Sequence, residues 1–185
     1  MRKLIAAINT TLDGFCDHTA VTADEEIHDH YTNLLNSAGT ILYGRITYQL
    51  MENYWPTLVK EPTGTKSMDE FAVAIDKIPK IVFSHTLKNI DWKTAKLAKK
   101  DIKEEVLELK QQAGKDILVG SPALIVAALN LGLVDELQLC VHPVISGSGS
   151  TPLLKPINDS IKLQLLKTKT FSCGAIMLYY EPSKK

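Results

Sequence analysis

The sequence predicts an α/β fold with a mixed, mostly parallel central sheet, helices on both of its faces and an antiparallel hairpin at its C-terminal edge. Over the first two thirds of the chain, short apolar segments alternate with segments of helical periodicity, which is typical of parallel strands joined by helices. In the last third, strand-like segments follow one another with no helix between them. At 185 residues the chain is long enough for one domain and short for two, so we expect a single domain over residues 1–185.

The expected elements follow from periodicity and from capping residues. Parallel strands are expected over residues 3–9, 40–43, 80–84 and 116–119, helices over 24–36, 46–53, 67–77, 100–112 and 123–131, and later strands over 136–142, 162–171 and 175–180. Asp24 can cap the first helix, Ser121 can cap the last one, and Pro122 suits the first turn of that last helix. The stretch 55–66, which contains Pro, Gly and Thr, is expected to be an internal loop.

Three local patterns carry further structural expectations. In the strand over 136–142, apolar residues at 137, 139 and 141 alternate with Glu136, Gln138 and Cys140, which predicts a long strand followed by a closing hairpin. His28 and His30 lie two apart on a helix, which makes a poor metal pair and favours a solvated helix. The glycine–serine run over 146–150 is expected to be a bulge between strands, with a phosphate nest as the alternative.

Composition and charge narrow the class of protein. Lys plus Arg and Asp plus Glu both number 21, so the formal charge is zero and neither nucleic acid nor a membrane surface is expected as a partner. The apolar segment at the N-terminus is too short for a signal core or a membrane span. Cys16, Cys140 and Cys173 lack CxxC spacing, so we expect no metal site, reduced thiols and a cytoplasmic protein.

Four junctions follow predicted strands, at the edge where open α/β sheets bind ligands. The first, residues 9–14, leads into a long polar loop over 15–23, which is either a lid or a simple turn around Asp13. At the second, Gly44 is followed by Arg45 and Thr47, which form either an anion site at a helix start or a turn with a solvated charge.

The third and fourth junctions leave similar alternatives open. Ser84 and His85 end a buried strand, where they contact a ribose or phosphate or only cap the next segment. Gly120 and Ser121 form a strand–glycine–helix junction of phosphate-binding type, which a well-capped buried helix explains equally well. The sequence lacks both GxGxxG and GxxxxGK[ST], which excludes the dinucleotide fingerprint and the P-loop.

In this order, the junctions resemble the dihydrofolate reductase superfamily, most closely the branch similar to the C-terminal reductase domain of the bifunctional riboflavin-biosynthesis deaminase/reductase. The resemblance covers nearly the whole chain and rests on five motifs in register: TLDG at 11–14, GRITY at 44–48, ILVGSPAL at 117–124, GLVDEL at 132–137 and HPVISGSG at 142–149. It implies the dihydrofolate-reductase-like three-layer fold and NADPH as hydride donor. The zinc-deaminase signature of the bifunctional enzymes, H-x-E with P-C-x-x-C, is not in this sequence.

The resemblance also implies roles for particular residues. At the phosphates of the cofactor we expect Gly44, Arg45 and Thr47, with Arg45 a candidate for the 2′-phosphate. Ser84 and His85 are expected near the adenosine half, and Ala7 in the nicotinamide pocket. The residues expected toward the pyrophosphate and the nicotinamide are Gly120, Ser121, Ala123 and Leu124. Asp13 would lie in the loop that closes over the reacting centre and is a candidate catalytic acid; a carboxylate on a helix and bound water are the alternative proton donors.

Candidates for the substrate side are Asp24, His28, Tyr48 and Trp55. The carboxylate of dihydrofolate reductases falls on His28 when counted back from Gly44, while Asp24 is an acid nearby. Tyr48, Tyr54 and Trp55 form either an aromatic wall for a flat substrate or part of the core.

The sequence therefore predicts an NADPH-dependent reductase of a small planar heterocycle of pterin or pyrimidine kind. One alternative is the 5-amino-6-(5-phosphoribosylamino)uracil reductase of riboflavin biosynthesis. Another, of a different class, is a non-catalytic module that keeps the fold and binds a nucleotide. We also expect a homodimer, because the C-terminal strands leave an apolar edge.

Overall fold

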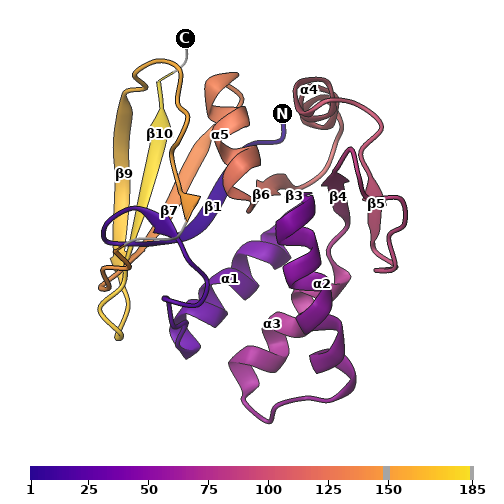
Figure 1. Cartoon of the computed structure of the whole chain (residues 1–185), viewed down its shortest axis with the longest axis vertical. Coiled ribbons are helices and arrows are strands. Elements are labelled where there is room, and N and C mark those ends of the chain that lie inside the picture. The colour runs from indigo at the N-terminus through magenta and orange to yellow at the C-terminus, as the bar shows by residue number, and fades with distance from the viewer. Residues whose placement is uncertain (148–150, 184–185) are drawn as a thin grey trace.

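The computed structural model describes residues 1–147 and 151–183. Within them, eight strands form one sheet in the order β5-β4-β3-β6-β1-β7-β10-β9 (Figure 1). In this order, every neighbouring pair from β5 to β7 is parallel, whereas β10 pairs antiparallel with both β7 and β9. The predicted mostly parallel sheet with a C-terminal antiparallel hairpin is confirmed.

The bounds of the elements are as follows. The strands are β1 (Leu4–Thr11), β2 (Phe15–Cys16), β3 (Ala38–Gly44), β4 (Lys80–Phe83), β5 (Ala95–Leu97), β6 (Asp116–Val119), β7 (Glu136–His142), β8 (Thr151–Pro152), β9 (Leu163–Thr170) and β10 (Ile176–Pro182). The helices are α1 (Glu25–Ser37), α2 (Arg45–Lys60), α3 (Lys66–Lys77), α4 (Ile102–Gln111) and α5 (Pro122–Asn130).

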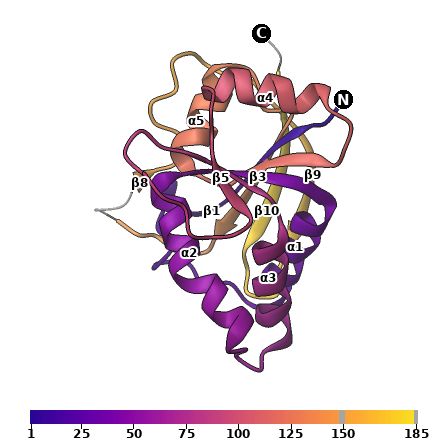
Figure 2. The same cartoon turned by 90° about the vertical axis from the view of Figure 1, so that its right-hand side faces the viewer.

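Helices cover both faces of the sheet (Figure 2). α4 and α5 lie on one face, where Val106 and Ile125 pack in the same buried cluster as Leu4 and Ile8 of β1. α1, α2 and α3 lie on the other face, where Ile5 of β1 belongs to a second buried cluster. Because side chains alternate along a strand, the neighbouring residues of β1 serve two separate cores. No helix in the described part of the chain is long and apolar enough to span a membrane.

Side-chain caps fix the starts of two helices. The Asp24 carboxylate accepts a hydrogen bond from the Ile27 N–H at the start of α1, as the sequence predicts. Asp101 does the same for α4 through the Glu104 N–H. Such a cap satisfies one of the N–H groups that a helix leaves unpaired at its N-terminus.

The structure corrects the expected loop over 55–66. α2 continues to Lys60 and contains Pro56. A proline inside a helix removes one main-chain hydrogen bond, so its cost must be offset by packing. The ring of Trp55 lies 4.5 Å from the ring of Phe71 on α3, which holds this part of α2 against its neighbour.

Three short strands, β2, β5 and β8, were not predicted from the sequence. β5 has three residues and pairs with β4. β2 and β8 form a two-residue ribbon that ties the beginning of the loop after β1 to Pro152. Pairings this short leave no periodic pattern in the sequence. Of the glycine–serine run over 146–150, residues 148–150 lie outside the described residues.

The face of β7 that carries Gln138 and Cys140 is buried. Cys140 is fully buried in a third cluster with Ile27 of α1 and Met177 of β10. His30 on α1 faces the same region, and burial lowers its pKa to about 4, so the expected solvated helix is wrong at this position. The reason is that α1 packs over this part of the sheet, where His30 contacts the ring of Tyr179 on β10.

Lys80 lies in a buried cage where α3 meets β4. Its side chain is 0% exposed, and its ammonium group donates to the main-chain oxygens of Asp76 and Ile78 and to the Thr94 hydroxyl. The same nitrogen sits 3.9 Å from the centre of the Trp92 ring, a cation–π contact. Burial lowers the pKa of Lys80 to about 7.

Replacing Lys80 by Met is expected to destabilise the fold by about 1–3 kcal/mol, because buried acceptors lose their donor. The pKa of Lys80 is lower in the folded state than in the unfolded state. At any pH between these two pKa values, the unfolded state therefore binds a proton that the folded state does not. The wild type should therefore gain stability as pH rises from 7 toward 10, and Lys80→Met should lack this part of the gain. Urea denaturation across this range measures both effects. The control Lys77→Met, at an exposed position, should change little; equal effects of the two variants would contradict the prediction.

Candidate active site

Two neighbouring strands end in the same small region and are joined there by a hydrogen bond. β3 ends at Gly44, and β6 beside it leads into Gly120 and Ser121. The Ser121 hydroxyl accepts a hydrogen bond of 2.8 Å from the Gly44 N–H, and Ser121 is only 2% exposed. The expected role of this hydroxyl as cap of α5 is therefore corrected: it bridges two strand ends. Pro122 does occupy the first turn of α5.

The helices that leave these strand ends have no side-chain caps. Neither Gly44 nor Ser121 supplies one, in contrast to Asp24 of α1 and Asp101 of α4. α2 and α5 then run along opposite faces of the sheet (Figure 2). The main-chain N–H groups of the first turns, at 45–47 in α2 and at 123 and 124 in α5, are thus the groups that helices offer to anions.

Arg45 adds a positive charge to the start of α2. Its side chain is exposed, and one guanidinium nitrogen donates to Gln49 at 3.0 Å. Thr47 is partly exposed in the same turn. Main-chain N–H groups at helix starts, an arginine and a hydroxyl are the donors that phosphates require, so these residues fit the phosphates of a dinucleotide.

The middle of the sheet is partly open beside these helix starts. β1 and β6 are central strands, yet Ala7, Asn9 and Gly120 keep partial exposure; we call these three residues the floor. A Cβ atom on Gly120 would lie 3.5 Å from the Tyr43 ring and 3.8 Å from the Ala7 oxygen, so Gly120 sits between β3 and β1. Small residues here leave the sheet accessible to a flat group.

The substrate-side candidates separate into two groups. The rings of His28 and Trp55 meet edge to face at 6.3 Å, and both pack against Phe71, which brings α1, α2 and α3 together. Burial lowers the pKa of His28, which favours its neutral form. Tyr48, in contrast, is fully buried and donates its hydroxyl to Glu52, so it is a core residue and not part of a ligand-facing wall.

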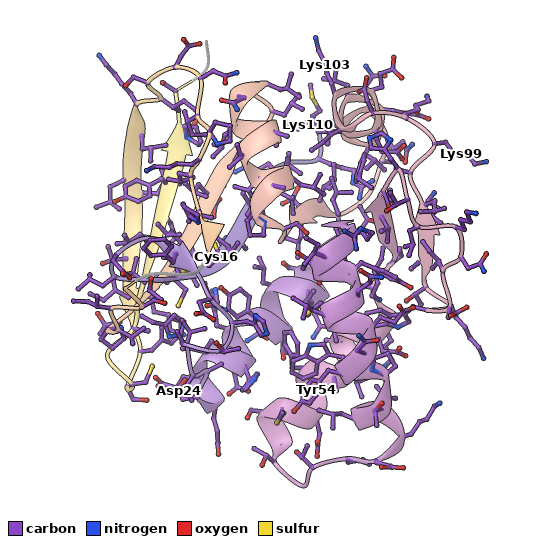
Figure 3. The ribbon with its side chains drawn as sticks, in the orientation of Figure 1. Cys16, Asp24, Tyr54, Lys99, Lys103 and Lys110 are labelled. Atoms are coloured by element: carbon purple, nitrogen blue, oxygen red, sulfur yellow. The ribbon has the colours of Figure 1, made fainter. Side chains whose placement is uncertain are left out.

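Asp13 and Asp24 both act as anchors between segments. The Asp13 carboxylate accepts hydrogen bonds from the Thr11 hydroxyl at 2.5 Å and from the N–H groups of Gly147 and Ser146 at 2.9 and 3.2 Å. The Thr11 hydrogen bond and these main-chain donors lower the pKa of Asp13, which favours the carboxylate over a proton-donating acid. Asp24 (labelled in Figure 3) accepts from Ser172 at 3.2 Å, besides capping α1.

The third junction behaves as a turn cap. The Ser84 hydroxyl accepts from the N–H groups of Thr86 and Leu87, while His85 is exposed. Because β4 is parallel to β3 and adjacent to it, both residues follow a strand end beside that of Gly44. In the residues that the structure describes, no group of three or more His, Cys, Asp or Glu side chains could hold a metal ion.

Sequence reasoning missed a polar cluster at the edge of the floor. Asn9 contacts Tyr31 of α1 and His142 of β7, each at 3.1 Å. The only sequence signals were a polar residue at the end of an apolar strand and a histidine that opens a motif. Neither indicates that the three side chains meet.

Comparison with known proteins assigns the chain to a family. The model of the RibD C-terminal domain matches residues 2–177. The chain belongs to this family. This RibD C-terminal domain is 38% identical over 183 residues to the protein YyaP of Bacillus subtilis (strain 168), covering 97% of this chain and 94% of that protein.

Solved structures agree on the fold of this RibD C-terminal domain. It is similar to a putative riboflavin biosynthesis protein from Shewanella sp. PV-4, with a TM-score of 0.70, 16% identity and coverage of 98% of this chain and 99% of that one. It is also similar to the riboflavin biosynthesis reductase Rib7 of Saccharomyces cerevisiae, with a TM-score of 0.63, 15% identity and coverage of 98% and 90%. The dihydrofolate-reductase-like fold implied by the sequence resemblance is confirmed.

Ser121→Ala is expected to cost about 1 kcal/mol of stability, because the Gly44 N–H loses its acceptor. Ser67 provides a matched control, since it is also buried but its hydroxyl has no hydrogen-bond partner in the described part of the chain. Ser67→Ala should therefore be neutral or stabilising. Urea midpoints of the two variants measure the difference, and an equal or larger loss for Ser67→Ala would refute it.

Proposed function

We propose that this RibD C-terminal domain is an NADPH-dependent reductase of a small planar heterocycle of pterin or pyrimidine kind. The observation that carries the proposal is the meeting of two uncapped helix starts, those of α2 and α5, beside the open floor of the sheet. When bound, NADPH supplies a hydride from its nicotinamide ring. Family membership supports reductase chemistry.

The cofactor is proposed to lie along the carboxyl ends of the parallel strands. Its phosphates would accept hydrogen bonds from the starts of α2 and α5, and Arg45 would contact the 2′-phosphate. Ser84 and His85 would lie toward the adenosine, and the nicotinamide would rest on Ala7 and Gly120. The burial of Leu42 and Val119 at the ends of β3 and β6 would help to exclude water from below the ring.

The substrate is proposed to lie between the floor and the paired rings of His28 and Trp55. A flat heterocycle suits an aromatic wall, because ring edges and faces attract one another.

A second candidate function is the reduction step of riboflavin biosynthesis, supported by the similarity to Rib7. The test is to express this chain in a riboflavin auxotroph that lacks only the reductase. Growth without added riboflavin would support the second candidate, and no growth would count against it.

Arg45→Ala is expected to weaken NADPH binding about 10- to 100-fold, because a charged hydrogen-bond donor contributes about 1.5–3 kcal/mol. NADH, which lacks the 2′-phosphate, should bind both proteins alike. Calorimetric titration of the two nucleotides measures the difference.

Lys60→Ala is the control, since Lys60 is also exposed but lies at the other end of α2. It should leave both affinities unchanged. Equal weakening of NADPH and NADH in Arg45→Ala would contradict the 2′-phosphate assignment. Flat titrations with wild type would refute the reductase proposal, and saturable NADPH binding without turnover on any pterin or pyrimidine would favour the nucleotide-binding module.

We also propose a homodimer formed through β9. All eight residues of this edge strand are exposed, and it carries Leu163, Leu165 and Leu166, which are 40%, 52% and 47% exposed. A cluster of exposed leucines on a sheet edge favours association, since burying it removes apolar surface from water.

Leu165→Glu should convert the dimer to a monomer, because the introduced charge would have to be buried at the interface. Sedimentation velocity at micromolar concentration measures the mass. Lys162→Glu, a charge change at the residue that precedes β9, is the control and should leave the dimer intact. A wild-type mass equal to the chain mass of 20.5 kDa would rule out the dimer.

A further inference from the structure

Asn9 is held by two partners from different elements. Its side-chain oxygen Oδ1 lies 3.1 Å from the Tyr31 hydroxyl on α1 and 3.1 Å from Nε2 of His142 on β7. The Tyr31 hydroxyl donates to Oδ1. An amide oxygen has two lone pairs, so the contacts from Tyr31 and His142 together fill its capacity as an acceptor.

His142 is suited to the second of these contacts. It is 3% exposed, and burial lowers the pKa of its ring against the opposing effect of the Asp24 charge. The ring is therefore neutral, and the tautomer with hydrogen on Nε2 donates to Asn9. Both contacts end on Oδ1, so this end of the Asn9 amide faces the two neighbours.

The other end of the amide is left free to bind a ligand. The Asn9 nitrogen Nδ2 points away from Tyr31 and His142, because the two ends of a planar amide diverge. It carries two hydrogens and makes no hydrogen bond to any residue in ranges 1–147 and 151–183, while Asn9 keeps partial exposure. An oriented, partly exposed donor that no protein group in the described ranges satisfies can serve as a recognition group for an acceptor on a ligand.

The position of Asn9 connects this donor to the proposed ring site. Asn9 follows Ala7 by two residues on β1, so both side chains face α1 and not α5. Ala7 in turn adjoins Gly120. With the nicotinamide resting on Ala7 and Gly120, a substrate ring stacked against it would therefore present its edge to the Asn9 amide.

We propose that Asn9 is a specificity-determining residue whose amide nitrogen donates to a ring carbonyl of the substrate, with Tyr31 and His142 as positioning residues. The inference rests on the proposed reductase function and narrows its substrate to oxo-heterocycles. Because Nδ2 only donates, a ring with an amino group in place of that carbonyl leaves two donors facing each other. Sites built to pair a polar group discriminate strongly against a ligand that cannot pair with it.

The test compares two pyrimidines that differ at ring position 4, where 6-aminouracil has an oxo group next to N3–H and 6-aminocytosine has an amino group next to a bare N3. Both keep the oxo group at position 2, so the comparison tests a carbonyl at position 4. Each is titrated by calorimetry into protein saturated with NADPH. Wild type is expected to bind the oxo compound about tenfold more tightly. Asn9→Asp should reverse this preference, because a carboxylate only accepts hydrogen bonds and still satisfies Tyr31 and His142.

Tyr31→Phe tests the positioning role without touching the ligand. It keeps the ring packing and removes one of the two donors that orient the amide, so Asn9 can turn over and present either end. The preference between the two pyrimidines should then fall toward unity, while the affinity for NADPH stays unchanged. Loss of packing alone would weaken the binding of both pyrimidines equally and leave the ratio of their affinities as in wild type.

The outcomes separate this inference from the proposed function. Wild type that fails to bind NADPH refutes the reductase proposal and the inference with it. If wild type binds NADPH but Asn9→Asp keeps the wild-type preference between the two pyrimidines, only the role of Asn9 is overturned. The same holds if neither pyrimidine binds to the NADPH-loaded protein. If Asn9→Asp does not fold, the ratio measured with Tyr31→Phe decides, and an unchanged ratio overturns the inference.

Discussion

The hydrogen bond from the Gly44 N–H to the Ser121 hydroxyl joins the two strand ends on which the candidate site depends. β3 and β6 are parallel neighbours, so their carboxyl ends reach the same edge of the sheet. From there, α2 and α5 depart toward opposite faces, which places one helix start on each side of the edge. A larger side chain at the buried Ser121 would separate these starts and disturb every donor that they position.

Much of the fold could be predicted because most elements carry their own signal. Asp24 before an apolar stripe marks α1, and Pro122 after a strand marks α5. The errors arose where contacts from elsewhere in the chain override local preference. Pro56 is tolerated because α2 packs on α3 through Trp55, and His30 is covered because α1 packs against Phe171 and Tyr179. Neither contact can be read from the residues around it.

The candidate site was predictable in part, for the same reason. Strand–glycine–helix junctions are local patterns, so Gly44 and Gly120 could be identified from sequence. The partners of Asn9 are 22 and 133 residues away, and no pattern records such a meeting. Tyr48 is the opposite case. It belongs to a motif that suggests a ligand, yet its side chain is buried and its hydroxyl donates a hydrogen bond to Glu52. Chemical type alone does not separate an aromatic wall from an aromatic core.

The two tryptophans occupy different environments, and this makes the chain its own optical reporter. Trp92 is 5% exposed, donates through its indole to Asp76 and lies under the Lys80 ammonium. Its emission is therefore tied to the integrity of the cage and insensitive to events at the floor of the sheet. Trp55 is partly exposed beside His28. Ligand-dependent emission would arise from Trp55, so unfolding and site occupancy can be followed separately in one unlabelled sample.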